Sequence, residues 1–282
     1  MPATILSHQA LVLPLKMRWP HRFSGLALCI GSMAPDLEFI GRMSHDWLFS
    51  HTLTAQVWFT VPVTLLLVWL LTAVLLPALV PYLRDHPDWR LHDLLALRAP
   101  VTWQDWGSVA FSGWLGGVSH VVLDGITHGN HSGWLVPWFP VLRTSVPHFG
   151  GPVPLHDALQ CWLTIGFAVL SLRWWRRIAR ERLLWSWRGT SAWTPPRQCR
   201  TVAYRLLAMV AIAAGTGVVI GGVFVARESG KAAAAAMAFG ALDVVFVALI
   251  VAATILRRRR NTDHHASDAT HHVMVSAGMT AG

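Results

Sequence analysis

The chain of 282 residues is long enough for one large domain or two small ones; 54% of its residues are hydrophobic and only 13% are charged. Soluble domains carry roughly 25% charged residues, so the composition argues against a soluble enzyme, and it also excludes disorder. The net charge of +9 comes from basic residues beside apolar runs, which is typical of a membrane protein and not of a nucleic-acid partner. The sequence therefore predicts an all-α, polytopic transmembrane helical bundle.

Several apolar segments are long enough, or nearly so, to cross a ~30 Å hydrocarbon layer as helices. Prolines within the first of them predict kinks or an early end. A shorter apolar segment, 23–34, is expected to form a re-entrant or interfacial helix. We therefore expect about five spans plus this short N-terminal helix. The expected spans are residues 57–83, 107–123, 155–172, 206–226 and 232–256.

The distribution of basic residues predicts which side of the membrane each connection faces. The segment 173–201 is rich in Arg and Trp, so we expect it on the cytoplasmic side of the inner membrane. Counting spans back from it places 84–106 in the cytoplasm and 125–154 outside. The same count predicts that His51, before the first span, and His120, at the end of the second, meet at one membrane surface.

Changes in composition predict four parts of the chain. These are a membrane core that carries the candidate site, a basic Trp-rich linker, a transmembrane hairpin and a disordered tail that contains histidines. Asp243 lies in the middle of the last span, where an acid forms a hydrogen bond to a neighbouring helix or has a functional role. The expected ranges are 1–172, 173–201, 202–256 and 257–282.

The strongest local motif contains His120, Asp124 and His128, which are spaced four residues apart. On a helix this spacing places all three side chains along one face. Two imidazoles and a carboxylate are a common ligand set for Zn²⁺ and for Fe²⁺ or Mn²⁺. The motif therefore predicts a divalent-metal site, with zinc as the first choice. Asp157 and Gln160, which open the third span, could support the metal ligands or cap that helix, and capping is the preferred interpretation.

Further acids and histidines are expected at the same membrane surface. Pro35 ends the short apolar helix and is followed by Asp36 and Glu38, while His8 lies near the N-terminus and His51 before the first span. A buried carboxylate is costly unless it has a partner. Convergence of these groups in a protein with so few charges therefore favours a shared cation.

These motifs also support a resemblance over about residues 1–175. Their order resembles a bacterial membrane family known as domain of unknown function 4184, which is itself distantly similar to inner-membrane metal-dependent hydrolases. The motifs are Thr4–His8, Gly31–Glu38, Ser50–Leu53 and Gly116–His128. As metal ligands the resemblance implies His8, Asp36, His51, His120, Asp124 and His128.

Three functions are compatible with this pattern. The first is a metal-dependent hydrolase that acts on an amphiphilic substrate, such as a lipid phosphoester, at the membrane surface, with Asp36 or Glu38 as general base. The second is a non-catalytic membrane protein in which the polar residues form a hydrogen-bonded structural cluster. The third is a transporter in which Asp243 and His120 relay protons.

Overall fold

The fold is an almost entirely helical bundle in a computed structural model, which describes residues 4–38, 49–129, 131–191, 200–225, 241 and 244–256. Within these residues the strands are β1 (Ser145–Val146) and β2 (Val153–Pro154), which pair antiparallel. The predicted all-α bundle is confirmed. Three described helices are long and apolar enough to cross a membrane, namely Gln56–Tyr82, Trp103–Thr127 and Leu155–Arg180.

The first long helix continues past two prolines through wider, π-helical turns. Such a turn precedes Pro62 and another precedes Pro77. Proline lacks the N–H that would bond the carbonyl four residues back and its ring clashes with that carbonyl, so a wider turn lets the helix proceed. The helix then ends just after Pro81. Its parts are the π turns Gln56–Thr60 and Leu70–Leu75, α5 (Val61–Trp69), α6 (Leu76–Leu79) and a final turn, Val80–Tyr82.

The other two long helices extend beyond their predicted ends. α7 (Trp103–Thr127) begins with a capping box, in which the Thr102 hydroxyl accepts from the Asp105 N–H and the Asp105 carboxylate accepts from the Thr102 N–H. α8 (Leu155–Arg180) continues without a break into the basic segment, so the border expected after residue 172 falls inside one helix. A short helix, α9 (Leu183–Arg188), follows.

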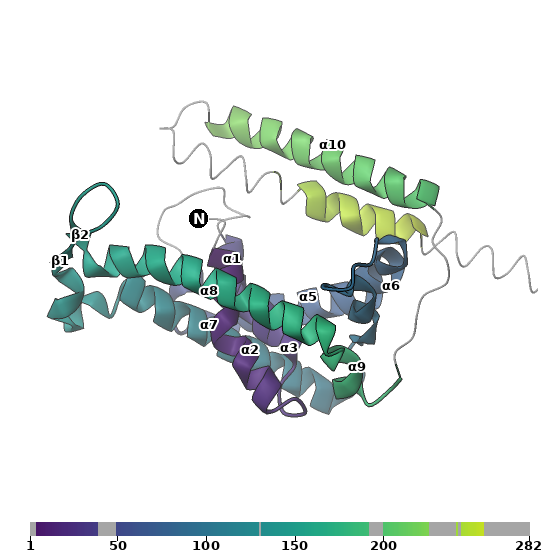
Figure 1. The fold of residues 1–282 in the computed structure, drawn as a ribbon, viewed down its shortest axis with the longest axis horizontal. Coiled ribbons are helices and arrows are strands. Elements are labelled where there is room, and N and C mark those ends of the chain that lie inside the picture. Colours follow the sequence, from purple (N-terminus) through teal and green to yellow (C-terminus); the bar gives the residue numbers. More distant parts are fainter. Residues whose placement is uncertain are drawn as a thin grey trace, which may run out of the picture.

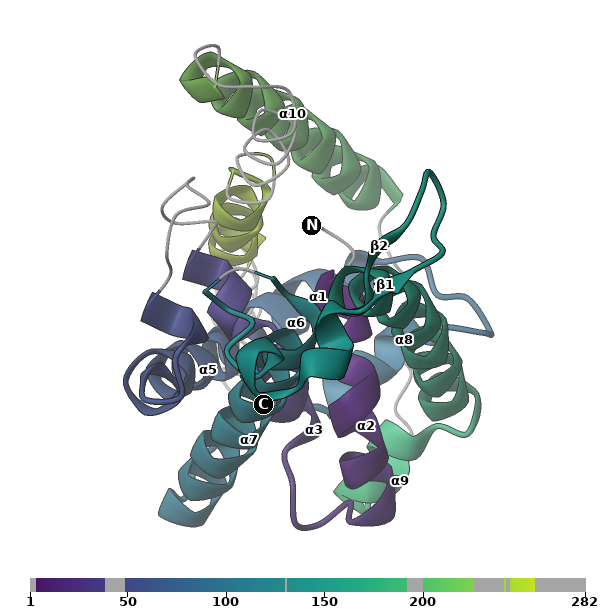
Figure 2. The same ribbon diagram turned by 90° about the vertical axis from the view of Figure 1, so that its left-hand side faces the viewer.

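The N-terminal helices pack against these long helices. α1 (Thr4–Ser7) and α2 (Gln9–Arg18) contact α8, whereas α3 (Gly25–Gly31) lies along α5 and α7 (Figure 1, Figure 2). α3 is the expected short apolar helix, and a 3₁₀ turn, Ala34–Asp36, follows it. α2 runs away from this turn and α3 runs back toward it, so both ends of the segment 8–36 lie near the C-terminal end of α7.

The predicted fourth and fifth spans are helical where they are described. α10 (Arg200–Val225) and a helix over residues 244–256, drawn in yellow, lie on the same side of the bundle in Figure 1 and Figure 2. Ala253 of that helix packs against Leu75 and Ala78 near α6. The turn between the two helices, Asp243 and the tail from residue 257 onward lie outside the described residues.

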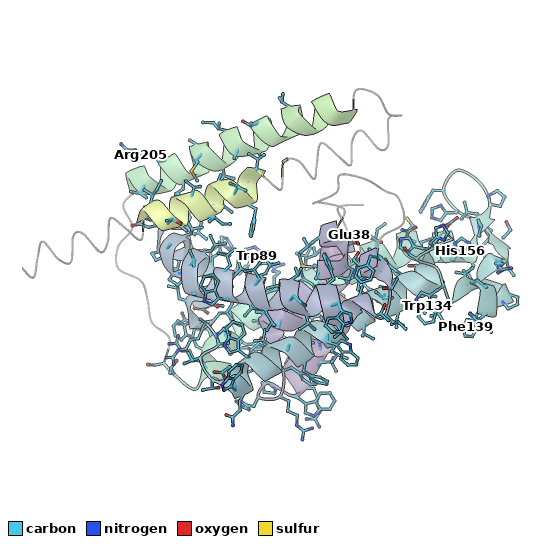
Figure 3. The ribbon with its side chains drawn as sticks, turned by 180° about the vertical axis from the view of Figure 1, so that it is seen from behind. Glu38, Trp89, Trp134, Phe139, His156 and Arg205 are labelled. Atoms are coloured by element: carbon cyan, nitrogen blue, oxygen red, sulfur yellow. The ribbon has the colours of Figure 1, made fainter. Side chains whose placement is uncertain are left out.

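Polarity in the bundle is arranged as in a membrane protein. The side chains of Gln56, Thr60 and Thr64 on the first long helix are fully buried. Leu66 of the same helix and Ile165 of α8 are exposed, as are many other large apolar side chains (Figure 3). Exposed apolar side chains are favourable in lipid, where polar groups must find partners inside the protein. The arrangement is therefore the one expected of a membrane protein.

A buried carboxylate joins the loop before α7 to α9. Asp93 is 2% exposed and accepts hydrogen bonds from the Arg182 guanidinium at 2.9 Å and from the Trp185 indole at 2.9 Å. Replacement of Asp93 by alanine leaves the buried indole N–H without an acceptor, so we expect a loss of about 1–3 kcal/mol in the free energy of unfolding. Thermal unfolding in detergent measures this loss. Glu181→Ala removes the exposed ion pair with Arg177 and is expected to leave stability unchanged.

Candidate metal centre

Four parts of the chain bring five of the six predicted ligands into one cluster and place the sixth, His128, beside it. His120 and Asp124 lie on the last turns of α7, and His128 follows the end of that helix. The other three come from the connection between α1 and α2, from the turn after α3 and from the turn before the first long helix. They are His8, Asp36 and His51.

The cluster forms where α3 crosses α7 at glycines. A Cβ at Gly116 would lie 2.5 Å from the Leu28 carbonyl oxygen and 2.7 Å from the Ser32 nitrogen. A Cβ at Gly31 would overlap the backbone of Gly113 on the facing helix. Only glycine permits this close approach of two backbones. The crossing brings the Ser32 carbonyl to the His120 ring.

Hydrogen bonds fix the tautomers of two histidines. His120 Nδ1 lies 2.9 Å from the carbonyl oxygen of Ser32, which can only accept, so Nδ1 carries the proton. The Ser50 hydroxyl donates to the Pro35 carbonyl at 2.8 Å and therefore accepts from His51 Nδ1 at 3.1 Å. When both rings are neutral, each presents a lone pair on Nε2, and the two Nε2 atoms lie 3.3 Å apart. Two facing lone pairs repel each other, and a cation bound by both nitrogens removes this repulsion.

Two carboxylates complete the set around these nitrogens. Asp36 Oδ1 lies 3.5 Å from His51 Nε2 and 3.6 Å from His120 Nε2. Asp124 Oδ2 lies 3.5 Å and 3.3 Å from the same two atoms. Hydrogen bonds between N and O are usually about 2.7–3.2 Å long, so these separations are too long for good hydrogen bonds. Bonds of about 2.0–2.1 Å to a tetrahedral Zn²⁺ place ligand atoms about 3.4 Å apart, which matches.

His8 lies on the other side of the Asp124 carboxylate. Its Nε2 is 3.6 Å from Asp124 Oδ1, and its ring stacks on that of His120 with the centroids 4.0 Å apart. Burial, and after it the neighbouring His120, lowers the pKa of His8 to about 3, so the ring is neutral. Its Nδ1 is buried and has no hydrogen-bond partner among the described residues. His8 therefore has one ring nitrogen without a partner among the described residues, at the edge of the cluster.

His128 is near the cluster, but both of its ring nitrogens are engaged. The Gln160 amide nitrogen lies 2.8 Å from His128 Nε2, and His128 Nδ1 donates to the Thr127 hydroxyl at 3.2 Å, because that hydroxyl donates to the Leu123 carbonyl. The prediction that Gln160 caps α8 is wrong, since Pro154 precedes that helix and no side chain caps it. Gln160 instead orients His128 toward Asp124 Oδ1, which lies 3.6 Å from Nδ1.

The charge of Asp36 suits a metal ligand or a base. Burial raises the pKa of Asp36, but positive charge on the neighbouring imidazoles, His120 first, and a hydrogen bond from His51 outweigh this and hold the pKa below its usual value. A carboxylate that is ionised at neutral pH is ready to bind a metal ion without first losing a proton. Asp36 is also the most exposed of the four side chains around the two Nε2 atoms, at 15%.

Two further polar residues hold the His51 turn in place. Glu38 Oε2 accepts a hydrogen bond of 2.7 Å from the Ser50 N–H. The fully buried Gln56 donates to the Ser50 and Thr52 carbonyls at 2.7 and 2.8 Å and accepts from the Thr60 hydroxyl. Sequence analysis missed Gln56, although an amide at the start of a long apolar helix is itself a signal of a buried polar role. The role of Glu38 as general base stays a prediction.

Loss of the Gln56 amide is expected to weaken metal binding without removing a ligand. Gln56→Leu keeps the size of the side chain but frees the backbone that carries His51. Partners of this kind are typically worth about 10–100-fold in metal affinity, so we expect a decrease of that order in a competitive Zn²⁺ titration. Gln104→Leu, at an exposed position of α7, is the control and should bind Zn²⁺ as the wild type does. Equal affinities of the two variants would contradict this role for Gln56.

A small cavity adjoins the cluster beside Asp124. It has a volume of about 10 Å³ and is lined by His8, Asp124, His128 and Gln160, among others. A space of this size holds about one water molecule. Its polar walls provide partners for that water next to the Asp124 carboxylate.

Comparison with known proteins adds a family and no activity. The chain matches the family described as domain of unknown function (DUF4184) over residues 1–258, which extends well beyond the first 175 residues that the motifs cover. No curated protein and no solved structure matches the chain. The similarity to metal-dependent hydrolases therefore stays a prediction.

Proposed function

The chain belongs to the DUF4184 family, and we propose from the geometry of its cluster that it binds a divalent metal ion, with zinc as the first choice. The observation that carries this proposal is the separation of 3.3 Å between His51 Nε2 and His120 Nε2, two nitrogens whose protons lie on the far side of each ring. Carboxylate oxygens of Asp36 and Asp124 lie 3.3–3.6 Å from them. Nitrogen and oxygen ligands in this number suit zinc.

We assign separate roles to the four central residues. His51, His120 and Asp124 are the ligands, which leaves one position open, as in catalytic zinc sites. Asp36, the most exposed of the four, lies beside these three and would accept a proton from the water at the open position, as general base. A divalent ion in this position supplies Lewis-acid chemistry, because it acidifies water and polarises a phosphoryl or acyl oxygen. The reaction that these groups support is hydrolysis.

The position of the cluster favours an amphiphilic substrate. It lies where α7 ends and just before the first long helix begins, that is, at one end of two helices that can cross a membrane. A lipid phosphoester places its polar group at this depth and its chains in the bilayer. The distribution of basic residues favours the outer face of the cytoplasmic membrane for this end, and we propose that the chain crosses that membrane several times.

The two other functions have less support from the geometry. A hydrogen-bonded structural cluster would show shorter separations than 3.3–3.6 Å between its nitrogens and oxygens. The proton-relay transporter depends on Asp243, which lies outside the described residues.

Elemental analysis of the detergent-purified protein tests metal binding. We expect about one zinc or similar divalent ion per wild-type chain and almost none in His120→Ala/Asp124→Ala. The matched control is His92→Ala/Asp85→Ala, which removes a His–Asp pair in the loop at the other end of α7 and should retain the metal. Equal, negligible metal in the wild type and the first double variant would end the proposal.

Hydrolysis is tested separately. Wild-type protein in nanodiscs is expected to cleave a fluorogenic lipid phosphoester, to lose this activity with a chelator and to regain it with Zn²⁺. If the protein binds zinc tightly, shows no hydrolysis and only loses thermal stability with the chelator, the metal site is structural instead.

A further inference from the structure

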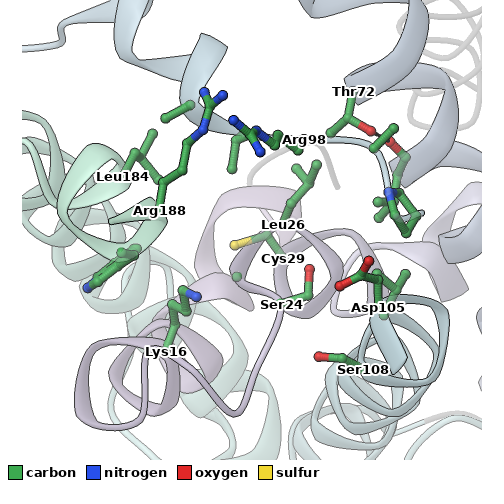
Figure 4. A pocket seen from close by; sticks show the side chains of 18 of the residues that line it. Lys16, Ser24, Leu26, Cys29, Thr72, Arg98, Asp105, Ser108, Leu184 and Arg188 are labelled. Carbon is green, nitrogen blue, oxygen red and sulfur yellow. Dashed lines mark hydrogen bonds between the residues drawn. The ribbon is translucent and has the colours of Figure 1, made fainter. Parts of the chain in front are cut away.

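A second cavity lies at the end of the bundle opposite the metal cluster. Its volume is about 580 Å³, and it is lined by the C-terminal parts of α2 and α8, the N-terminal parts of α3 and α7, and α9 (Figure 4). α2 begins beside His8 and α7 ends at the cluster, so their other ends lie far from it. The two sites therefore lie toward opposite ends of the long helix α7.

The cavity has an apolar wall with indole groups. Two tryptophans contribute to it, and both come from the basic, Trp-rich part of the chain. A wall of this kind accommodates acyl chains and places tryptophan at headgroup depth. The apolar lining includes Leu13, Leu26, Val68, Ile178, Trp175 and Trp187.

The polar side of the cavity carries positive charge without a matching acid. Arg98 and Arg188 point into the same space from different segments (Figure 4). Neither forms an ion pair with a carboxylate among the described residues, and Arg188 Nε is buried without a hydrogen-bond partner. Burial, and after it the nearby Arg98, lowers the pKa of Arg188 from its usual value, and Arg188 Nη1 donates to the Leu95 carbonyl at 3.1 Å.

The other charged groups of the cavity do not neutralise this pair. The Asp105 carboxylate accepts from the backbone N–H groups of Val101 and Thr102 at 3.2 and 2.9 Å and so caps α7. Lys16 adds a further positive charge beside the Trp187 ring. The cavity thus combines two uncompensated guanidinium groups with an apolar wall.

We propose that this cavity binds the phosphate group of an anionic amphiphile, such as an anionic phospholipid of the cytoplasmic leaflet. Arg98 and Arg188 contact the phosphate oxygens, for which guanidinium is well suited. The apolar wall receives the start of the chains. Basic pockets between membrane helices on the cytoplasmic side are known to bind such headgroups. The proposal does not depend on the metal cluster.

Native mass spectrometry of the detergent-solubilised full chain tests this. The probes are dioleoyl phosphatidic acid, dioleoyl phosphatidylcholine and inorganic phosphate. We expect phosphatidic acid to bind at least about tenfold more tightly than phosphatidylcholine, and Arg98→Gln to remove most of this preference, since a charge-assisted contact is worth roughly that much. Arg98 is exposed, so its replacement should not disturb folding. Arg188→Gln is the second variant.

The control is Arg173→Gln, which removes an exposed positive charge of α8 outside the cavity and should leave binding unchanged. Equal binding of both lipids, or equal loss of binding in Arg173→Gln and Arg98→Gln, would overturn the proposal. If inorganic phosphate binds as tightly as phosphatidic acid, the proposal of an amphiphilic ligand is wrong and the cavity is a site for free phosphate. Retention of zinc in all three variants separates these results from the fate of the metal site.

Discussion

His120→Ala is expected to lower the affinity for Zn²⁺ by about 100-fold or more, whereas His128→Ala should lower it by about tenfold or less. The two histidines flank Asp124 at equal spacing in the sequence, so spacing alone predicts equal losses. In the structure His120 Nε2 faces His51 Nε2 and the carboxylates of Asp36 and Asp124, whereas both nitrogens of His128 have hydrogen-bond partners. Competitive titration with a chromophoric zinc chelator measures both affinities.

Asp36→Asn tests, in the same zinc titration, whether Asp36 is a metal ligand or a general base. If Asp36 accepts a proton from water, the variant keeps zinc affinity within about tenfold and loses hydrolysis. A loss of zinc as large as that of His120→Ala would show that Asp36 is a ligand and that the metal has four protein ligands. Equal losses for His120→Ala and His128→Ala would contradict the assignment of the ligands.

Sequence reasoning located the cluster because polar residues are rare in this chain. His120 and Asp124 share a helix face by their spacing of four residues, and counting spans places His51 at the same surface. The structure brings these three together with Asp36 and His8. Which nitrogens face the centre could not be predicted, because the tautomers depend on the Ser32 carbonyl and the Ser50 hydroxyl, which only the tertiary fold brings to the rings.

The helix ends were harder to predict than the helices themselves. α8 extends to Arg180 because Arg and Trp are compatible with a helix at a membrane surface, although they lower its hydropathy. The prolines of the first span predicted kinks, but the wider turns that absorb Pro62 and Pro77 have no signature in composition. Gly116 and Gly117 were part of a motif, yet their role is visible only where α3 and the first long helix approach α7.

Gly116→Ala is expected to destabilise the fold by about 1–3 kcal/mol, although alanine is the better helix former. The added Cβ would lie 2.5 Å from the Leu28 carbonyl oxygen and 2.7 Å from the Ser32 nitrogen. Both are backbone atoms, one in α3 and one in the residue that follows it, so no side-chain rotation can relieve the contact. α3 must move, and with it the Ser32 carbonyl that fixes the His120 ring. We therefore expect weaker zinc binding together with a lower melting temperature.

Gly107→Ala on the same helix is the matched control. A Cβ at Gly107 meets no atom within 4 Å, so the variant gains only the helix propensity of alanine, worth up to about 1 kcal/mol. If the close crossing of α3 and α7 is required, thermal unfolding in detergent should show a lower melting temperature for Gly116→Ala and an equal or higher one for Gly107→Ala. Zinc titration should show weaker binding for Gly116→Ala only. If Gly116→Ala is as stable as Gly107→Ala and binds zinc normally, the crossing does not position the cluster.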